Sequence, residues 1–102
     1  MTKDNFQFKV NASIQLVPLG GLDTYKIIDL AIEEIQKTGF PYEVGPFSTS
    51  IEATLDEILS LITAIRNRVF NEEAQEILIN VQIQARKNGD VSVMEKVRKH
   101  RV

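Results

Sequence analysis

Cysteine and tryptophan are absent from this sequence, and histidine occurs once, at position 100. Without cysteine the chain can form no disulfide, no thiolate metal site and no cysteine nucleophile. A single histidine argues against a histidine-based catalytic triad and against a multi-histidine metal site within one chain. Aromatic residues make up only 7% of the chain, which argues against a surface that stacks nucleic-acid bases.

Extremes of charge and hydropathy are missing as well. The formal net charge is −2, so neither nucleic acid nor an anionic membrane is an expected partner. No apolar run is long enough to span a bilayer, and the N-terminal stretch MTKDNFQFKV lacks the apolar core of a signal peptide. We therefore expect a cytoplasmic protein. The length suits a single domain, residues 1–102.

The first clear pattern in the chain is that of a strand. Residues 8–16 alternate apolar and polar side chains, which predicts a β-strand with one buried face. Pro18 and the Gly20-Gly21 pair should end this strand. After Lys9, its polar side carries only small, uncharged, hydrogen-bonding side chains, namely Asn11, Ser13 and Gln15.

Helical spacing follows in two places. The first helix should be capped by Asp23 or Thr24 and stopped by Gly39 in a left-handed conformation. The second should begin at a capping box, in which the side chains of Thr54 and Glu57 each accept a hydrogen bond from the other residue's amide. The expected apolar stripes are Ile28, Ala31, Ile32 and Ile35 in the first helix, and Leu55, Ile58, Leu59, Ile62, Ile65 and Val69 in the second.

Three further strands complete the pattern. The Gly45-Pro46 pair divides the second β region into short strands, Tyr42–Val44 and Phe47–Ile51. Residues 76–86 alternate again and predict the last strand, and a second capping box, Ser92 to Glu95, should open a short helix. The order predicts an α+β ferredoxin-like βαββαβ sandwich, with a four-stranded antiparallel sheet, helices on one face and an extra C-terminal helix.

In that fold the helices cover one face of the sheet, so the polar sides of the first and last strands share the other. The last strand contributes Leu78, Asn80, Gln82 and Gln84 to this face. Charge appears only at its ends, at Lys9 and Arg86. Amides and hydroxyls with partners can be buried at far lower cost than charges. We therefore expect another subunit's sheet, a ligand, or both to cover this face; the alternative is a solvated face.

Taken together, three stretches resemble the small thiamine-binding proteins related to YkoF. They are SIQLVPLG at residues 13–20, GFPYEVGPFSTSIEATLDEI at residues 39–58, and residues 88–97. The resemblance implies a ferredoxin-like protomer that assembles through its open sheet face into dimers or tetramers. It also implies non-catalytic binding of thiamine or of its hydroxymethylpyrimidine part. The chain departs from its relatives in the loop at residues 20–23 and at Gln84-Ala85, where relatives often carry an acidic pair.

Thiamine joins a cationic thiazolium to an aminopyrimidine, so its site needs a carboxylate, an aromatic or apolar wall, and amides or hydroxyls. The residues that we assign to ligand binding are Ser13, Gln15, Tyr42, Phe47, Thr49, Glu52, Asn80 and Gln82. Each also has a structural interpretation. Glu52 could serve the positive end of the second helix, and Thr49 could simply favour a strand. Tyr42 and Phe47 could be core aromatics, and Asn80 and Gln82 could contact a partner subunit alone.

The same fold is compatible with two other classes of function. A structural or regulatory ferredoxin-like interaction module that senses another small metabolite would share this fold. An enzyme is not expected: acylphosphatases have this fold, but they need an arginine after the first strand to grip phosphate, and LVPLGGLD has none. No nucleophile stands beside a base either. We therefore predict no catalytic residue, no metal site and no required cofactor, with thiamine as the candidate ligand.

Overall fold

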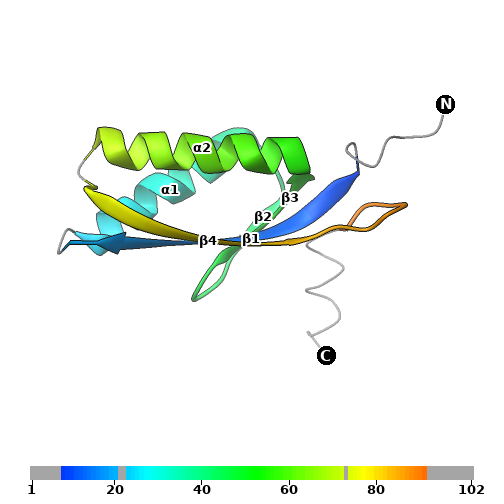
Figure 1. The fold of residues 1–102 in the computed structure, drawn as a ribbon, viewed down its shortest axis with the longest axis horizontal. Helices are drawn as coiled ribbons and strands as arrows, with labels where there is room; N and C mark the ends of the chain where they lie inside the picture. Colours follow the sequence, from blue (N-terminus) through cyan, green and yellow to red (C-terminus); the bar gives the residue numbers. More distant parts are fainter. Residues whose placement is uncertain (1–7, 21–22, 73, 92–102) are drawn as a thin grey trace.

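The computed structural model describes residues 8–20, 23–72 and 74–91. Its elements are β1 (Lys9–Leu19), α1 (Thr24–Thr38), β2 (Tyr42–Val44), β3 (Thr49–Thr54), α2 (Leu55–Asn71) and β4 (Glu76–Gln84). The strands form one antiparallel sheet in the order β2-β3-β1-β4. Figure 1 shows both helices on one side of this sheet. The ferredoxin-like βαββαβ sandwich is confirmed, and the expected C-terminal helix lies outside the described residues.

Pro18 does not end β1, contrary to expectation. The Lys9 N–H donates to Asp90 Oδ1 (2.7 Å), and its carbonyl oxygen accepts from the Val91 N–H (2.9 Å), so both groups face the side of β4. Because amide direction alternates along a strand, odd-numbered residues of β1 face β4 and even-numbered residues face β3. β3 pairs with β1 only as far as Ile14, so the N–H that Pro18 lacks would point where no described strand lies.

Three further strand boundaries differ from those expected. β3 begins at Thr49, two residues late, because a hydrogen bond from the Gly45 N–H to the Ser48 carbonyl (2.9 Å) holds the preceding turn outside the sheet. It ends at Thr54 instead of Ile51, because its last residues continue to pair with the start of β1. β4 ends two residues early, because Arg86 pairs with Gly89 across a turn instead of with β1. The turn itself is formed by Lys87 and Asn88.

The ends of α1 follow the signals in the sequence. Asp23 is the N-cap, and its carboxylate accepts from the Lys26 N–H at 3.1 Å. Gly39 ends the helix at φ 75°, a left-handed conformation that costs other residues roughly 1–2 kcal/mol. The buried side is rotated from the expected stripe, because Ile27 and Leu30 are buried while Ile28 and Ile32 are only partly so.

In α2, the expected capping box is present. The Glu57 N–H donates to Thr54 Oγ1 (3.3 Å), and the Thr54 N–H donates to Glu57 Oε1 (3.0 Å). The side facing the sheet is formed by Ile58, Leu61, Ile65 and Val69. The prediction that Leu59 belongs to this stripe is wrong: it is 51% exposed, because it lies about 100° around the helix from Ile58.

Removing the capping hydroxyl in Thr54→Ala should lower the free energy of unfolding by about 1 kcal/mol, because the Glu57 N–H loses its partner. The measurement is urea unfolding at a fixed protomer concentration. Thr63→Ala is the control, since its hydroxyl bonds only to the Leu59 carbonyl within the same helix (3.2 Å). Equal losses in the two variants would contradict a capping role.

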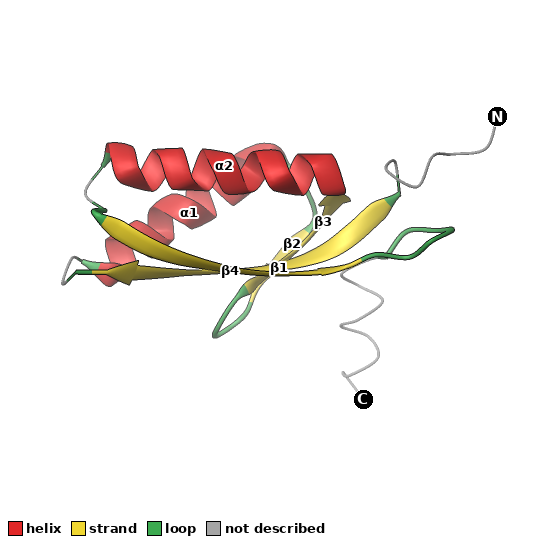
Figure 2. Cartoon of the chain, viewed as in Figure 1, coloured by secondary structure: helices red, strands yellow, loops and turns green. Residues whose placement is uncertain are grey.

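The core lies between the helices and the sheet. The largest fully buried side chains are Ile27, Ile51, Ile58, Ile65, Val69 and Val91. The apolar side of β4 packs at the margin of this core, where Ile77, Ile79 and Val81 are only partly buried. No helix within the described residues has the length and apolar content needed to cross a bilayer. Figure 2 shows that the opposite face of the sheet carries no described helix, which makes it the surface of interest.

Candidate functional site

The sheet face away from the helices carries a band of uncharged polar side chains. Ser50 of β3, Ser13 of β1 and Gln82 of β4 are register partners and lie side by side. One step along, Gln15 pairs with Asn80. Neighbouring strands are about 4.8 Å apart, so these side chains form one continuous surface. The expectation that the first and last strands share a polar face is confirmed, since β1 and β4 are direct neighbours.

A hollow of about 220 Å³ opens in this band. It is lined by Ser13, Gln15, Phe47, Ser48, Asn80 and Gln82. Ser13 Oγ donates to Ser48 Oγ (2.9 Å), and Asn80 Nδ2 donates to Gln15 Oε1 (3.0 Å). A side-chain amide has two donor hydrogens and an acceptor oxygen, so Asn80 and Gln15 keep capacity for further hydrogen bonds. Typical ligand pockets are larger, about 300–1,000 Å³, so this hollow is small for a ligand site.

Phe47 lies at the tip of the β2–β3 hairpin, which projects from the sheet on the side opposite the helices (Figure 2). Its side chain is 81% exposed. Glycine is favoured at position 45 of this tip, because a Cβ there would lie only 3.0 Å from the Ser48 carbonyl oxygen. Phe47 also borders a second hollow of about 250 Å³, whose wall includes Glu43. An aromatic ring this exposed, between two hollows, is suited to contact a bound molecule.

Tyr42 and Thr49 lie on the other face of the sheet. Tyr42 pairs with Ile51 and Thr49 pairs with Ile14, and both partners are buried core residues. Thr49 itself is only 7% exposed. Alternate residues of a strand point to opposite faces, so the structure separates these two side chains from the hollow. The sequence-based prediction groups them with Ser13, because these short strands do not show which of their side chains point to the polar face.

Glu52 is on the polar face but outside the hollow. It pairs with Asn11, two residues along β3 from Ser50, which places it about 7 Å from the row that contains Ser13. Asn11 is only 6% exposed, and no buried side-chain nitrogen or oxygen among the described residues lacks a partner. Because of this register, Glu52 lies at the border of the band, beside the buried Asn11.

Sequence reasoning missed Glu43 and Ser48. Glu43 pairs with Ser50 and so brings a carboxylate to the polar face. A strand of three residues is too short for its alternation to be recognised, although the apolar neighbours Tyr42 and Val44 were a signal. Ser48 reaches the hollow through the shape of the hairpin turn, for which the Gly45-Pro46 pair gave only a general hint.

The chemistry of the hollow is that of hydrogen bonding. The Ser13 hydroxyl donates to another serine hydroxyl, which cannot activate it as a general base would. Within residues 8–20, 23–72 and 74–91, no group of three or more His, Asp or Glu side chains could hold a metal ion. Neutral amides and hydroxyls beside an aromatic ring can bind a flat polar ring through its edge and its face.

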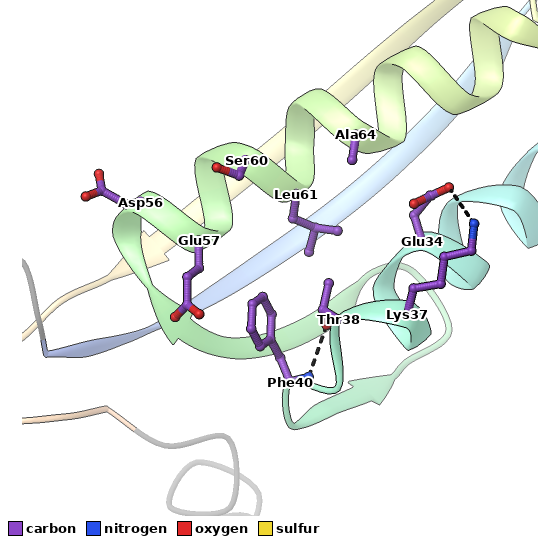
Figure 3. A pocket seen from close by; sticks show the side chains of 9 residues that line it. All are labelled: Glu34, Lys37, Thr38, Phe40, Asp56, Glu57, Ser60, Leu61 and Ala64. Carbon is purple, nitrogen blue, oxygen red and sulfur yellow. Dashed lines mark hydrogen bonds and ion pairs between the residues drawn. The ribbon is translucent and has the colours of Figure 1, made fainter.

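A larger hollow, of about 400 Å³, lies between the end of α1 and the start of α2. Figure 3 shows Phe40 and Leu61 pointing into it. The carboxylate of Glu34 at its margin is already paired with Lys37 (3.2 Å) and with Arg68 (3.1 Å). None of the sequence-predicted binding residues lines it, so the sheet face remains the candidate site.

Comparison with known proteins gives a consistent family. The model of the family described as thiamine-binding protein matches residues 12–101. A UPF0045 protein of Clostridium perfringens is 34% identical over 92 residues, which cover 89% of this chain and 96% of that protein. The similarity therefore extends over both chains almost completely.

Two solved structures are similar to this chain in both fold and sequence. A domain of unknown function, DUF77, from Bacillus cereus has a TM-score of 0.86 and 31% identity, with 97% of this chain and 96% of that chain covered. A protein of Thermotoga maritima, described as a candidate thiamine biosynthesis/salvage protein, has a TM-score of 0.83 and 32% identity, with 91% and 99% covered. Both share the βαββαβ fold described above.

Proposed function

This chain belongs to the thiamine-binding protein family, and from this premise we propose that it binds thiamine, or the hydroxymethylpyrimidine part of thiamine, without catalysis. The site is the hollow of neutral hydrogen-bonding side chains beside the exposed Phe47. Binding occurs in a homo-oligomer whose open sheet faces cover one another. The observation that carries the proposal is the grouping of Ser13, Gln15, Phe47, Asn80 and Gln82 around one hollow.

The aminopyrimidine of thiamine suits the amides of this hollow. Its exocyclic amino group donates hydrogen bonds, and its ring nitrogens accept them. Gln15, Asn80 and Gln82 each offer an amide oxygen and an amide nitrogen, so they can match both kinds of group. Because all three are uncharged, covering them with a ligand costs less than covering carboxylates or ammonium groups would.

The thiazolium cation suits the hairpin side of the site. Phe47 presents a ring face to which a cation is attracted by about 0.5–2 kcal/mol. Glu43 adds a carboxylate to the wall on the other side of Phe47, where an opposite charge favours a cationic ligand. We therefore assign to Glu43 the role that Glu52 has in the sequence-based prediction, because Glu43 lines a hollow together with Phe47 and Glu52 lines neither hollow.

A second copy of the chain would complete the enclosure. The hollow of one protomer, about 220 Å³, is below the usual size of a ligand site, and Phe47 is 81% exposed. Two sheets that pack face to face lie about 10 Å apart, which leaves the side chains of both to form the walls. The low charge of the band supports this arrangement, because uncharged polar groups are tolerated in an interface when they are hydrogen-bonded.

The test is isothermal titration with thiamine on protein whose mass has been fixed by light scattering. We expect saturable binding, with one site per protomer or per dimer. Asn80→Ala and Phe47→Ala should each weaken binding by about tenfold, the value of one lost hydrogen bond or cation contact. Gln36→Ala is the control, since this exposed side chain lies on α1, on the far side of the sheet.

Two results would count against the proposal. An intact oligomer that binds no thiamine and no hydroxymethylpyrimidine would rule out this ligand. Equal affinities for Asn80→Ala, Phe47→Ala and Gln36→Ala would show that thiamine binds elsewhere on the protein.

A further inference from the structure

The larger hollow, between the end of α1 and the start of α2, has no role in the binding of thiamine proposed above. Its volume of about 400 Å³ lies within the range of about 300–1,000 Å³ that is usual for small-molecule sites. Its walls come from residues 34–40 and 56–64, in the helix layer, and we call it the interhelical hollow. The polar band is on the opposite side of the sheet (Figure 2), so the two hollows are separate.

The floor of the interhelical hollow is apolar and held in place. Phe40 and Leu61 point into it, and Ala64 follows Leu61 after about one turn of α2 (Figure 3). Because the alanine side chain ends at Cβ, this part of the wall leaves room that a longer side chain would take. Thr38 Oγ1 donates to the Ile35 carbonyl (2.6 Å) and accepts from the Phe40 N–H (3.0 Å), which fixes the backbone that carries the ring. The hollow therefore offers a preformed surface for a flat apolar body.

The rim of the hollow is acidic on the α2 side. On the α1 side, the carboxylate of Glu34 is already paired with Lys37 (3.2 Å) and Arg68 (3.1 Å). Asp56 and Glu57, in the first turn of α2, form no ion pair with any described residue. Glu57 extends toward Phe40 across the mouth of the hollow (Figure 3). The positive end of α2 offsets only about half a charge, so this rim is negative.

We propose that the interhelical hollow binds a small primary amine with an aromatic body. The ring of the amine packs against Phe40 and Leu61, where aromatic and aliphatic contacts are both available. The ammonium group lies at the α2 rim, beside Asp56 and Glu57. The proposal rests on two separate observations, an apolar floor of the size of a ligand site and a rim whose negative charge has no partner.

An ammonium group suits this rim better than other ligand groups do. It carries three N–H donors, and ionised carboxylates accept hydrogen bonds without donating any. An anion of the same shape would be repelled by Asp56 and Glu57, and a neutral alcohol would gain nothing from their charge. The thiazolium nitrogen of thiamine carries no N–H, so the interhelical hollow and the polar band select different cations. The proposal therefore stands whether or not the polar band binds thiamine.

An NMR titration of the full chain tests the proposal with three probes of one shape. Tryptamine, tryptophol and indole-3-acetate share an indole ring and differ in carrying an ammonium, a hydroxyl or a carboxylate group. We expect tryptamine to shift the amide signals of Phe40, Leu61 and Ala64 and to leave that of Ser13, in the polar band, in place. It should bind at least about tenfold more tightly than indole-3-acetate, because the rim attracts the first and repels the second. Excess thiamine should not change its affinity.

Two variants locate the bound amine. Ala64→Leu fills part of the hollow and should weaken tryptamine binding by at least about tenfold. Glu57→Gln removes a charge but keeps a side chain that can close the capping box, and it should weaken binding by about two- to fivefold. Thr63→Leu and Asp29→Asn are the matched controls, because both positions are exposed and neither lines the hollow. Circular dichroism checks that all four variants are folded.

Three outcomes would overturn the proposal. The first is the absence of a saturable shift with tryptamine, or an equal affinity for indole-3-acetate. The second is loss of tryptamine binding in excess thiamine, with shifts at Ser13, which would show that the amine uses the polar band. The third is an unchanged affinity in Glu57→Gln together with an unchanged affinity in folded Ala64→Leu, each relative to its control. If Ala64→Leu does not fold, Glu57→Gln against Asp29→Asn decides.

Discussion

Replacing Ile65 by alanine should lower the free energy of unfolding by about 2–5 kcal/mol. Ile65 is fully buried on α2 and belongs to the cluster that joins this helix to Ala12 of β1 and Ile51 of β3. Truncation removes apolar atoms that are in contact on all sides and leaves a cavity between helix and sheet. Because a domain is stable by only about 5–15 kcal/mol, this single change should remove a large share of the total.

Urea unfolding measured at a fixed protomer concentration would show the effect as a lower midpoint, with the slope unchanged. Leu59→Ala on the same helix is the matched control. Its side chain is 51% exposed, so the loss should be well below that of Ile65→Ala. Similar losses for the two variants would mean that α2 does not pack on the sheet through the side that contains Ile65.

Ser13→Arg should reduce both assembly and ligand binding. Ser13 lies in the middle of the polar band, between Ser50 and Gln82, and its hydroxyl bonds to Ser48. In a single protomer the new side chain can extend into water, so the fold should tolerate it. In a covered face it becomes an unpaired charge, which costs about 3–5 kcal/mol, more than about a hundredfold in affinity.

Light scattering and titration with thiamine on the same sample would check this prediction. The mass should fall by half, and saturable thiamine binding should be lost. Ser60→Arg is the control, because Ser60 is exposed on α2, on the opposite side of the sheet, and both properties should be unchanged. A Ser13→Arg protein with wild-type mass would show that the polar face stays open to solvent.

In long periodic segments of this chain, the sequence predicts which face each side chain points to. In short segments it does not. The alternation over β1 and β4 correctly places Ser13, Gln15, Asn80 and Gln82 on one face. β2 has three residues, so its alternation is too short to decide which of Tyr42 and Glu43 points to that face, although the apolar Val44 is a weak signal. The hollow also depends on how the β2–β3 turn aims Phe47, and this is a property of its backbone rather than of its composition.

For the helices, too, the sequence predicts some features and not others. Their caps were predictable because Asp23, Gly39, Thr54 and Glu57 act within one turn of the chain. Which side of each helix is buried depends instead on how the helix rests on the sheet. This is why Leu59 was placed in the core although it is exposed.

The strand order has a consequence for how the chain folds. Of the described strands, β1 is synthesised first, and its longer partner, β4, is synthesised last. Pairs such as Asn11 with Gln84 join segments far apart in sequence, and closing such long loops slows folding relative to helical proteins of the same size. On a ribosome, the residues of β1 beyond Ile14 would wait without any partner strand until β4 emerges. We therefore expect chaperones to contact this part of β1 during synthesis until β4 has emerged.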